Sequence, residues 1–525
     1  MQFLNYMLPE LILLVAAAAL FVVGASVSPA ARKASPVVAL GALLVALLVV
    51  LISDAPISPR DASGLLSVVG FSLYIKATAI GVGILFVLLA WPTSKDGASN
   101  DSISFNTETG EYFALLLLAL AGVCVTVSAN SLPTLFLGIE LASIPTYIMV
   151  TMSRPQVAAQ EAGIKYFFLG AAAAALMLFG MSYLFGVTGA MRFDEITHAL
   201  TQMREAGVAI PPMVTLAVVL MLLGFAFKLA AFPMHFYAGD VYQGAATPVT
   251  AAISFIPKVT GAVAIITILH VVGASGPGAW ALDPKIVKLL WIMAVLTMTI
   301  GNVLGLLQYN IKRVMAYSSI AHSGYVLAGI ATLATASTSG LQADALGAVA
   351  MYLLAYGVMN TCVFGVLMML PSRRPAQATT AETYDDLTGA ARKRPLLGLA
   401  MAVGCLSLIG VPATVGFFAK FYLIRPAILS EDSTLLALAI LIMINATISA
   451  AYYLKIIATM WAKPDPTADV SDSADASAAC VCSPPLGIAL TLCVTATVVF
   501  GVALPLTAAL WNVSSAAAMT FLANR

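Results

Sequence analysis

The stretch Gly224-Phe-Ala-Phe-Lys228 returns in the second half of the chain as Gly416-Phe-Phe-Ala-Lys420. Each copy places a lysine inside a long apolar run, and each lies close to a proline, Pro233 or Pro412. Proline removes an intrahelical hydrogen bond and interrupts a helix. At membrane depth, such a backbone is tolerated only where it is buried in protein or lines a cavity. The two copies therefore predict two discontinuous membrane helices built on one repeated plan.

The composition around these stretches is that of a membrane protein. Of 525 residues, 61% are hydrophobic and 9% are charged, whereas about a quarter of residues are charged in soluble domains. A membrane span needs roughly 20 mainly apolar residues. Fourteen stretches qualify, at about 7–27, 36–53, 71–91, 112–129, 131–151, 161–187, 213–237, 248–270, 286–307, 315–335, 341–370, 396–425, 435–461 and 485–510. We therefore expect an all-α, polytopic membrane protein with about 14 transmembrane helices.

The repeated stretches fall in the seventh and twelfth of these spans. Copies that lie an odd number of spans apart run in opposite directions, as in transporters built from inverted repeats. The sequence thus predicts inverted five-helix repeats, with helices 7 and 12 discontinuous. The predicted units are an N-terminal three-helix segment (1–111), a first repeat (112–270), a second repeat (271–462) and a flexible loop with a final span (463–525).

Sorting the basic residues by loop predicts the orientation. Twelve Lys and Arg residues fall in loops of one parity and seven in the opposite set. Because cytoplasmic loops attract positive charge, both termini are predicted to be non-cytoplasmic. The cytoplasmic loop 463–484 is too rich in Ala, Ser and Asp to bury an apolar core. The six cysteines, two of them Cys480 and Cys482 in this loop, form no zinc or iron–sulfur pattern, so no metal site is expected.

Five ionisable residues lie deep inside the predicted spans: Glu140, Lys165, Lys228, Lys258 and Lys420. A charge near the bilayer centre costs about 2.5–3.5 kcal/mol on insertion scales, and such residues usually mark an ion or proton route. A buried Glu140 also needs a cationic partner, since an unpaired buried charge costs several kcal/mol. Lys228 is the expected partner.

Other polar residues have a structural alternative. Glu161 and Lys165 are four residues apart in the favourable helical order, so Lys165 can belong to a structural pair. We interpret Lys76 and Lys455 as side chains that snorkel to the interface, and Lys312-Arg313 as a positive-inside anchor. His322 and His235 can simply satisfy backbone carbonyls. The stretch 192–212 is either a surface helix or a solvated connector.

Three longer runs carry a resemblance to a known family. They are Lys228-Leu-Ala-Ala-Phe-Pro233-Met-His235-Phe-Tyr-Ala-Gly-Asp240-Val-Tyr-Gln-Gly-Ala-Ala-Thr-Pro248, Ile311-Lys-Arg-Val-Met-Ala-Tyr317-Ser-Ser-Ile-Ala-His322-Ser-Gly-Tyr325, and Gly410-Val-Pro412-Ala-Thr-Val-Gly416-Phe-Phe-Ala-Lys420-Phe. Together they resemble the antiporter-like membrane subunits of respiratory complex I, the proton-pumping NADH:quinone oxidoreductase, which are kin of Mrp-type sodium/proton antiporters. Two positions depart from the family pattern, because Gly239 and Ala246 stand where proline is common.

The resemblance implies roles for seven residues. It implies that Glu140 and Lys228 form a coupling pair, that Lys258 and His322 continue a central polar axis, and that Lys420 delivers the proton outward. Lys165 and His235 match further positions of this proton path.

The resemblance also implies the setting. NADH, FMN, iron–sulfur clusters and quinone are expected in partner subunits, with no cofactor in this chain. The expected partners are an antiporter-like neighbour, small membrane subunits and the lipid bilayer of a bacterial plasma membrane, and no nucleic acid. Two alternatives stay open: a subunit of an Mrp-type antiporter or membrane-bound hydrogenase, and a purely structural member of the membrane arm.

Overall fold

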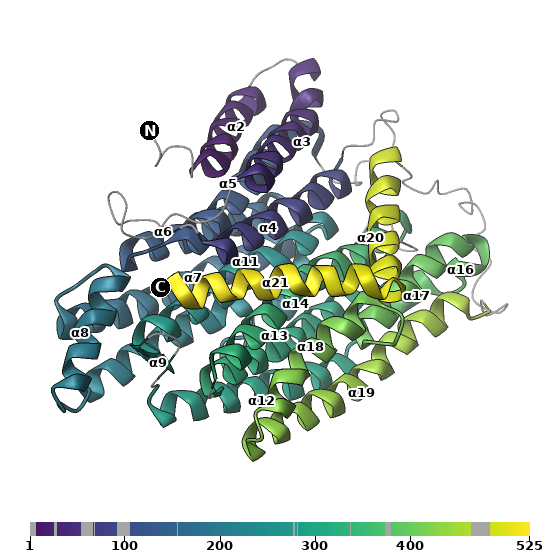
Figure 1. Cartoon of the computed structure of the whole chain (residues 1–525). Helices are drawn as coiled ribbons and strands as arrows, with labels where there is room; N and C mark the ends of the chain where they lie inside the picture. The colour runs from purple at the N-terminus through teal and green to yellow at the C-terminus, as the bar shows by residue number, and fades with distance from the viewer. Residues whose placement is uncertain are drawn as a thin grey trace.

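The computed structural model describes residues 7–25, 29–53, 67, 69–91, 105–154, 156–276, 279–280, 282–336, 338–372, 380–463 and 483–524. This part of the chain is helical apart from its connections and one short antiparallel ribbon, β1 (Ala274–Gly276) with β2 (Ala279–Trp280). Most of the helices lie side by side in one slanted bundle (Figure 1). The helices are α2 (Leu8–Ala25), α3 (Pro29–Ile52), α4 (Gly70–Leu89), α5 (Phe105–Ser128), α6 (Leu132–Met152), α7 (Val157–Thr188), α8 (Phe193–Glu205), α9 (Pro212–Leu229), α10 (Ala238–Gly244), α11 (Thr247–Gly273), α12 (Pro284–Leu306), α13 (Ile311–Thr335), α14 (Ser339–Met369), α15 (Tyr384–Leu387), α16 (Ala390–Lys393), α17 (Pro395–Ile409), α18 (Val415–Leu429), α19 (Ser433–Trp461), α20 (Pro484–Val502) and α21 (Leu504–Asn524).

The predicted all-α membrane class is confirmed. Thirteen helices of the described part are long and apolar enough to cross a membrane. The predicted spans 315–335 and 396–425 correspond to α13, which is rich in polar residues, and to the two short helices α17 and α18. Each of the fourteen predicted spans therefore coincides with one helix or with a pair of helices.

Both predicted helix breaks are present. Helix α9 ends directly after Lys228, and eight residues without helix separate it from α10. Helix α17 ends at Ile409, and α18 begins at Val415. Gly410 has a φ of +92° in the second break, a backbone conformation that suits glycine because it has no Cβ. The inverted relation of the two halves and the domain boundaries stay predictions.

Helix α11 forms the centre of the bundle. All of its residues are buried, because α4, α5, α6, α9, α13 and α14 pack around it. A helix that is apolar on every side is expected in such a position. The consequence for function is that Lys258, in the middle of α11, is enclosed by other helices and is only 4% exposed.

The stretch 192–212 contains a surface helix, as one of the two interpretations predicted. In α8, Phe193, Ile196 and Leu200 are buried. The Thr197 hydroxyl donates to the Val271 carbonyl at 3.0 Å, and Arg204 donates to the Ala274 carbonyl at 2.7 Å. The solvated-connector alternative is therefore wrong, because α8 closes the end of α11.

The last predicted span, 485–510, is longer than expected and bent. Helices α20 and α21 meet at Ala503 and run in clearly different directions (Figure 1). Gly501 packs so tightly on the backbone of Ala413 and Thr414 that a Cβ at this position would collide with it. The Trp511 ring stacks on Tyr422 at 4.1 Å. The C-terminal helices thus cover the break between α17 and α18. The predicted flexible loop, with Cys480 and Cys482, lies almost wholly outside the described residues.

The snorkelling interpretation of Lys76 is wrong. Its side chain in α4 is 1% exposed, and its Nζ lies 2.6 Å from the Glu10 Oε1 in α2, which is also 1% exposed. Lys76 is therefore half of a buried ion pair that joins the N-terminal helix to the bundle. Lys455, by contrast, is exposed and lies 4.5 Å from the centre of the Tyr384 ring, which agrees with the snorkelling interpretation.

Substituting one member of this pair is expected to destabilise the subunit. Glu10→Gln or Lys76→Met alone leaves an uncompensated buried charge, which costs about 3–5 kcal/mol, whereas apolar replacement of both partners is often neutral. The temperature at which the detergent-solubilised complex loses this subunit should therefore fall for each single variant and recover for Glu10→Leu/Lys76→Met. Lys455→Met is the control. Equal transition temperatures in all four proteins would contradict the assignment.

Candidate functional site

The predicted pair between Glu140 and Lys228 is present. Glu140 lies on α6, and the Lys228 Nζ at the end of α9 lies 2.9 Å from its Oε1. The lysine side chain is 2% exposed and the carboxylate 16%. The break follows α9, so Lys228 is the last but one residue of this helix.

Two hydroxyl groups of α6 complete the surroundings of this lysine. The Lys228 Nζ donates to the Ser143 Oγ at 2.8 Å and to the Tyr147 hydroxyl at 3.0 Å. A lysine ammonium has three donors, and Glu140, Ser143 and Tyr147 accept all three. The donors of the Lys228 ammonium are therefore all accepted by protein groups.

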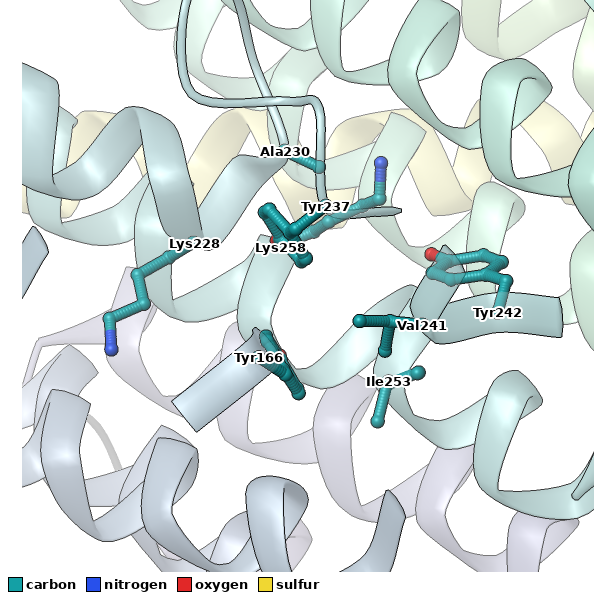
Figure 2. A pocket seen from close by; sticks show the side chains of 8 residues that line it. All are labelled: Tyr166, Lys228, Ala230, Tyr237, Val241, Tyr242, Ile253 and Lys258. Carbon is teal, nitrogen blue, oxygen red and sulfur yellow. The ribbon is translucent and has the colours of Figure 1, made fainter. Parts of the chain in front are cut away.

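A pocket separates this pair from Lys258. It is lined by Tyr166, Lys228, Ala230, Tyr237, Val241, Tyr242, Ile253 and Lys258. In Figure 2, the stems of Lys228 and Lys258 border the pocket while both ammonium groups point away from its centre. The two lysines thus share one small cavity but bind different groups.

Lys258 has hydroxyl and carbonyl partners in place of a counter-ion. Its Nζ donates to the Ser319 carbonyl and to the Ser323 Oγ, both on α13. The Nζ also lies 5.5 Å from the centre of the Tyr356 ring. The Tyr356 hydroxyl in turn donates to the Ser319 Oγ at 2.9 Å. Lys258 is therefore held by neutral groups that can exchange partners.

His322 lies on the same helix and bonds to two tyrosines. Its Nδ1 lies 2.6 Å from the Tyr352 hydroxyl, and its Nε2 lies 3.2 Å from the Tyr453 hydroxyl. His322 is 2% exposed. The alternative that this ring only bonds to backbone carbonyls is therefore wrong, because both ring nitrogens bond to side-chain hydroxyls.

Lys420 lies at the second helix break. Its Nζ donates to the Leu408 and Ile409 carbonyls, both at 2.8 Å, and lies 4.9 Å from the centre of the Tyr325 ring. The last carbonyls of a helix have no intrahelical partner, and a cation is stabilised by the negative end of the helix dipole. The break therefore creates the binding site for this ammonium group.

Lys165 and His235 are placed differently. The Lys165 side chain is 43% exposed and pairs with Glu161 at 2.7 Å and with Asp240 at 3.1 Å, so the predicted structural pair is present. His235 is half-buried in the segment between α9 and α10. Its Nδ1 has no hydrogen-bond partner among the described residues.

Lys312, interpreted as part of a positive-inside anchor, is buried inside the protein, and its part in the membrane orientation stays a prediction. This side chain is 0% exposed, and its Nζ lies 3.1 Å from the Glu382 Oε1. It also donates to the Gln243 and Ala245 carbonyls. Arg154 approaches the same carboxylate at 2.6 Å. Burial alone would raise the pKa of Glu382, but the charges and hydrogen bonds of Lys312 and Arg154 outweigh it and lower the pKa below its ordinary value.

The sequence did not single out the hydroxyl groups that surround these residues. They are Ser143, Tyr147, Ser319, Ser323, Tyr352, Tyr356 and Tyr453. Their one sequence signal is position, because each is a polar residue inside an otherwise apolar span. Among the described residues, no group of three or more His, Cys, Asp and Glu side chains could hold a metal ion.

Comparisons with known proteins agree with this architecture. The family model described as NADH:quinone oxidoreductase/Mrp antiporter, transmembrane, matches residues 129–448. A protein of Trichlorobacter lovleyi named NADH-quinone oxidoreductase subunit N is 40% identical over 355 residues, which are 68% of each chain. A chain of respiratory complex I from Thermus thermophilus superposes with a TM-score of 0.72 at 27% identity, covering 95% of this chain and 98% of the other. A chain of the Mrp complex from a Dietzia species shares the fold, with a TM-score of 0.74 at 19% identity and coverage of 99% and 98%. This chain therefore belongs to the transmembrane family of the NADH:quinone oxidoreductases and Mrp antiporters.

Proposed function

We propose that this chain is a proton-translocating membrane-arm subunit of an NADH:quinone oxidoreductase, seated in a bacterial plasma membrane with both termini non-cytoplasmic. One observation carries the proposal. Ionisable residues on α6, α9, α11, α13 and α18 lie inside an apolar bundle, and each is bonded there to an opposite charge, a hydroxyl group or a carbonyl. Such groups are costly in a membrane and mark ion or proton routes. The relatives named subunit N support the choice of complex.

In this proposal, the pair between Glu140 and Lys228 is the input of the subunit. When the pair is closed, the carboxylate stabilises the charged lysine. When the pair opens, Lys228 loses this stabilisation inside an apolar bundle and releases a proton more readily. The shared pocket connects the change at Lys228 to Lys258.

The route then continues along α13 to Lys420. Lys258 and His322 are linked to one helix and to the tyrosines around it, so each can pass a proton without leaving the buried region. Lys420 sits at the second break, where it delivers the proton outward. Lys165 and His235 stay predicted members of the path.

The redox chemistry belongs to partner subunits in this proposal. They supply the sites for NADH, FMN, iron–sulfur clusters and quinone, while this chain holds and moves protons at the atoms named above. The partners in the membrane are an antiporter-like neighbour and small membrane subunits. A subunit of an Mrp-type cation/proton antiporter or of a membrane-bound hydrogenase is the second candidate, because the matched family includes Mrp antiporters.

The Lys258→Met variant distinguishes a proton-translocating subunit from a purely structural one. The variant is expected to assemble, because the partners of Lys258 are neutral groups that can bond elsewhere. It should lower the protons moved per NADH oxidised at least about tenfold, since a positioned proton-transfer group contributes typically 10²–10⁴-fold. Proton uptake and quinone reduction are measured together in inverted vesicles, with vesicles lacking the chain as baseline. Normal pumping by the assembled variant would overturn the proposal. Uptake that follows a sodium gradient and not quinone would select the antiporter.

A further inference from the structure

We infer that α10 is a strut that fixes the spacing between Lys228 and Lys258, and that Lys312 is the positioning residue that holds this strut. The inference rests on the proposed function and adds to it a device outside the proton path. Helix α10 has only seven residues and follows the first helix break, so its own backbone cannot fix its position.

Two tyrosines on and next to α10 bond to groups that adjoin the two lysines. The Tyr237 hydroxyl, at the start of α10, donates to the Phe227 carbonyl at 2.7 Å, one residue before Lys228. The Tyr242 hydroxyl, one turn further, lies 2.9 Å from the Ser319 Oγ, and the carbonyl of Ser319 accepts from Lys258. Both tyrosines line the pocket between the two lysines (Figure 2). A shift of α10 therefore moves groups that bind or adjoin both lysines.

Lys312 holds the C-terminal end of α10 in place. The Lys312 ammonium, fully buried at the start of α13, donates to the Gln243 and Ala245 carbonyls at the C-terminal end of α10. These carbonyls have no intrahelical partner, and a cation at this end of a helix is favourable. Glu382 balances the charge at 3.1 Å. The buried Lys312 ammonium thus bonds to the C-terminal end of α10 and to Glu382 at the same time, and it holds this end of α10 against α13.

Two ion pairs on the exposed side of α10 also help to hold this helix in place. Asp240 on α10 receives Arg313 at 2.7 Å and Lys165 at 3.1 Å. The Asp240 side chain is 40% exposed, and exposed ion pairs contribute little. Lys312 is therefore the main anchor, and Arg313 is a matched control because it is the adjacent basic residue and contacts the same helix.

Gly239 and Ala246, the two positions where this chain departs from the family pattern, lie in α10 and shortly after it. Gly239 lies within α10, which is helical despite this glycine. The Ala246 N–H donates to the Ser153 Oγ at 3.1 Å, a bond that a proline could not make. The end of α10 is thus fixed from α13 by Lys312 and from the connection after α6 by Ser153.

The test compares Lys312→Met, Tyr242→Phe and the double variant, with Arg313→Gln as control and Lys312→Arg as rescue. Each is measured in the assembled complex as protons moved per NADH oxidised. Lys312→Met and Tyr242→Phe should each lower this ratio roughly threefold to thirtyfold, the range of coupling changes seen for residues that touch no ligand. Because both act through α10, the double variant should be no worse than the stronger single one. Arg313→Gln should stay near wild type, and Lys312→Arg should recover most of the ratio.

Three results overturn the inference. The first is a normal ratio in assembled Tyr242→Phe, and the second is additive loss in the double variant. The third is less assembled complex with an unchanged ratio in Lys312→Met, which would make the role of Lys312 purely structural. Lys258→Met separates this failure from failure of the proposed function. If it blocks pumping while Tyr242→Phe does not, only the strut is wrong, and if it pumps normally, the proposed route itself is wrong.

Discussion

A Lys228→Met variant is expected to assemble and to lose proton pumping about a hundredfold, the middle of the range for a positioned proton-transfer group. Methionine keeps most of the apolar stem and removes the ammonium group that binds Glu140, Ser143 and Tyr147. The Glu140 carboxylate then loses its cationic partner on α9, so there is no longer a charge pair that can open and close.

Two further variants make this expectation specific. Glu140→Gln keeps a hydrogen-bond acceptor for Lys228 but removes the charge, and it should lose pumping to a similar extent. Lys455→Met makes the same chemical change at an exposed lysine of α19 and should pump normally. Proton uptake by inverted vesicles, divided by the amount of assembled complex, is the measurement. If Lys228→Met and Lys455→Met pump equally well, the pair does not couple this subunit to its neighbours.

The membrane architecture could be predicted from local properties of the sequence. Apolar length locates a span because every spanning helix must satisfy its backbone internally, and each predicted span is occupied by helix. The breaks at Pro233 and Pro412 were visible for the same reason. The bend at Ala503 was not, since an apolar run passes through it, and the direction of α21 depends on packing against α14 and α4.

The ionisable members of the site could also be predicted, but not their partners. Charge in an apolar run is rare enough to attract notice, which identified Glu140, Lys228, Lys258 and Lys420. Charge balance predicted that Glu140 has a cationic partner, and the family resemblance implied that this partner is Lys228. The hydroxyls of Tyr352 and Tyr453 could not be assigned to His322, because they come from α14 and α19 and only the packed bundle brings these helices to α13.

One error has a clear physical cause. Lys76 lies near the end of a predicted span, where a lysine ordinarily reaches the interface. In this chain, it meets the Glu10 carboxylate inside the protein. The position of a lysine along a span therefore does not decide whether its side chain is exposed, because a segment that is distant in the sequence can supply a counter-charge.

Variants of Lys420 distinguish clearly between two roles of this residue, which are capping the end of a helix and carrying a proton. Lys420→Gln should assemble, because its amide can still donate to the Leu408 and Ile409 carbonyls, as the lysine does at 2.8 Å. Lys420→Arg keeps both the donors and the positive charge, but a guanidinium does not release its proton in a protein. If Lys420 only caps α17, both variants should pump like the wild type.

If Lys420 carries the proton, both variants should instead lose pumping about a hundredfold, whether the charge is absent or permanent. Pumping is measured per assembled complex in inverted vesicles, and the intact quinone-binding part is checked by quinone reduction with an uncoupler present. The expected pattern is normal assembly of Lys420→Gln, strongly reduced proton uptake by both variants, and uncoupled quinone reduction that is less affected than uptake. Wild-type uptake by Lys420→Arg would assign this residue to electrostatics alone, because a fixed charge would then suffice. Lys420 lies directly at the break between α17 and α18. Loss of pumping in both variants would therefore also identify this break as the point where the proton leaves the buried ionisable residues.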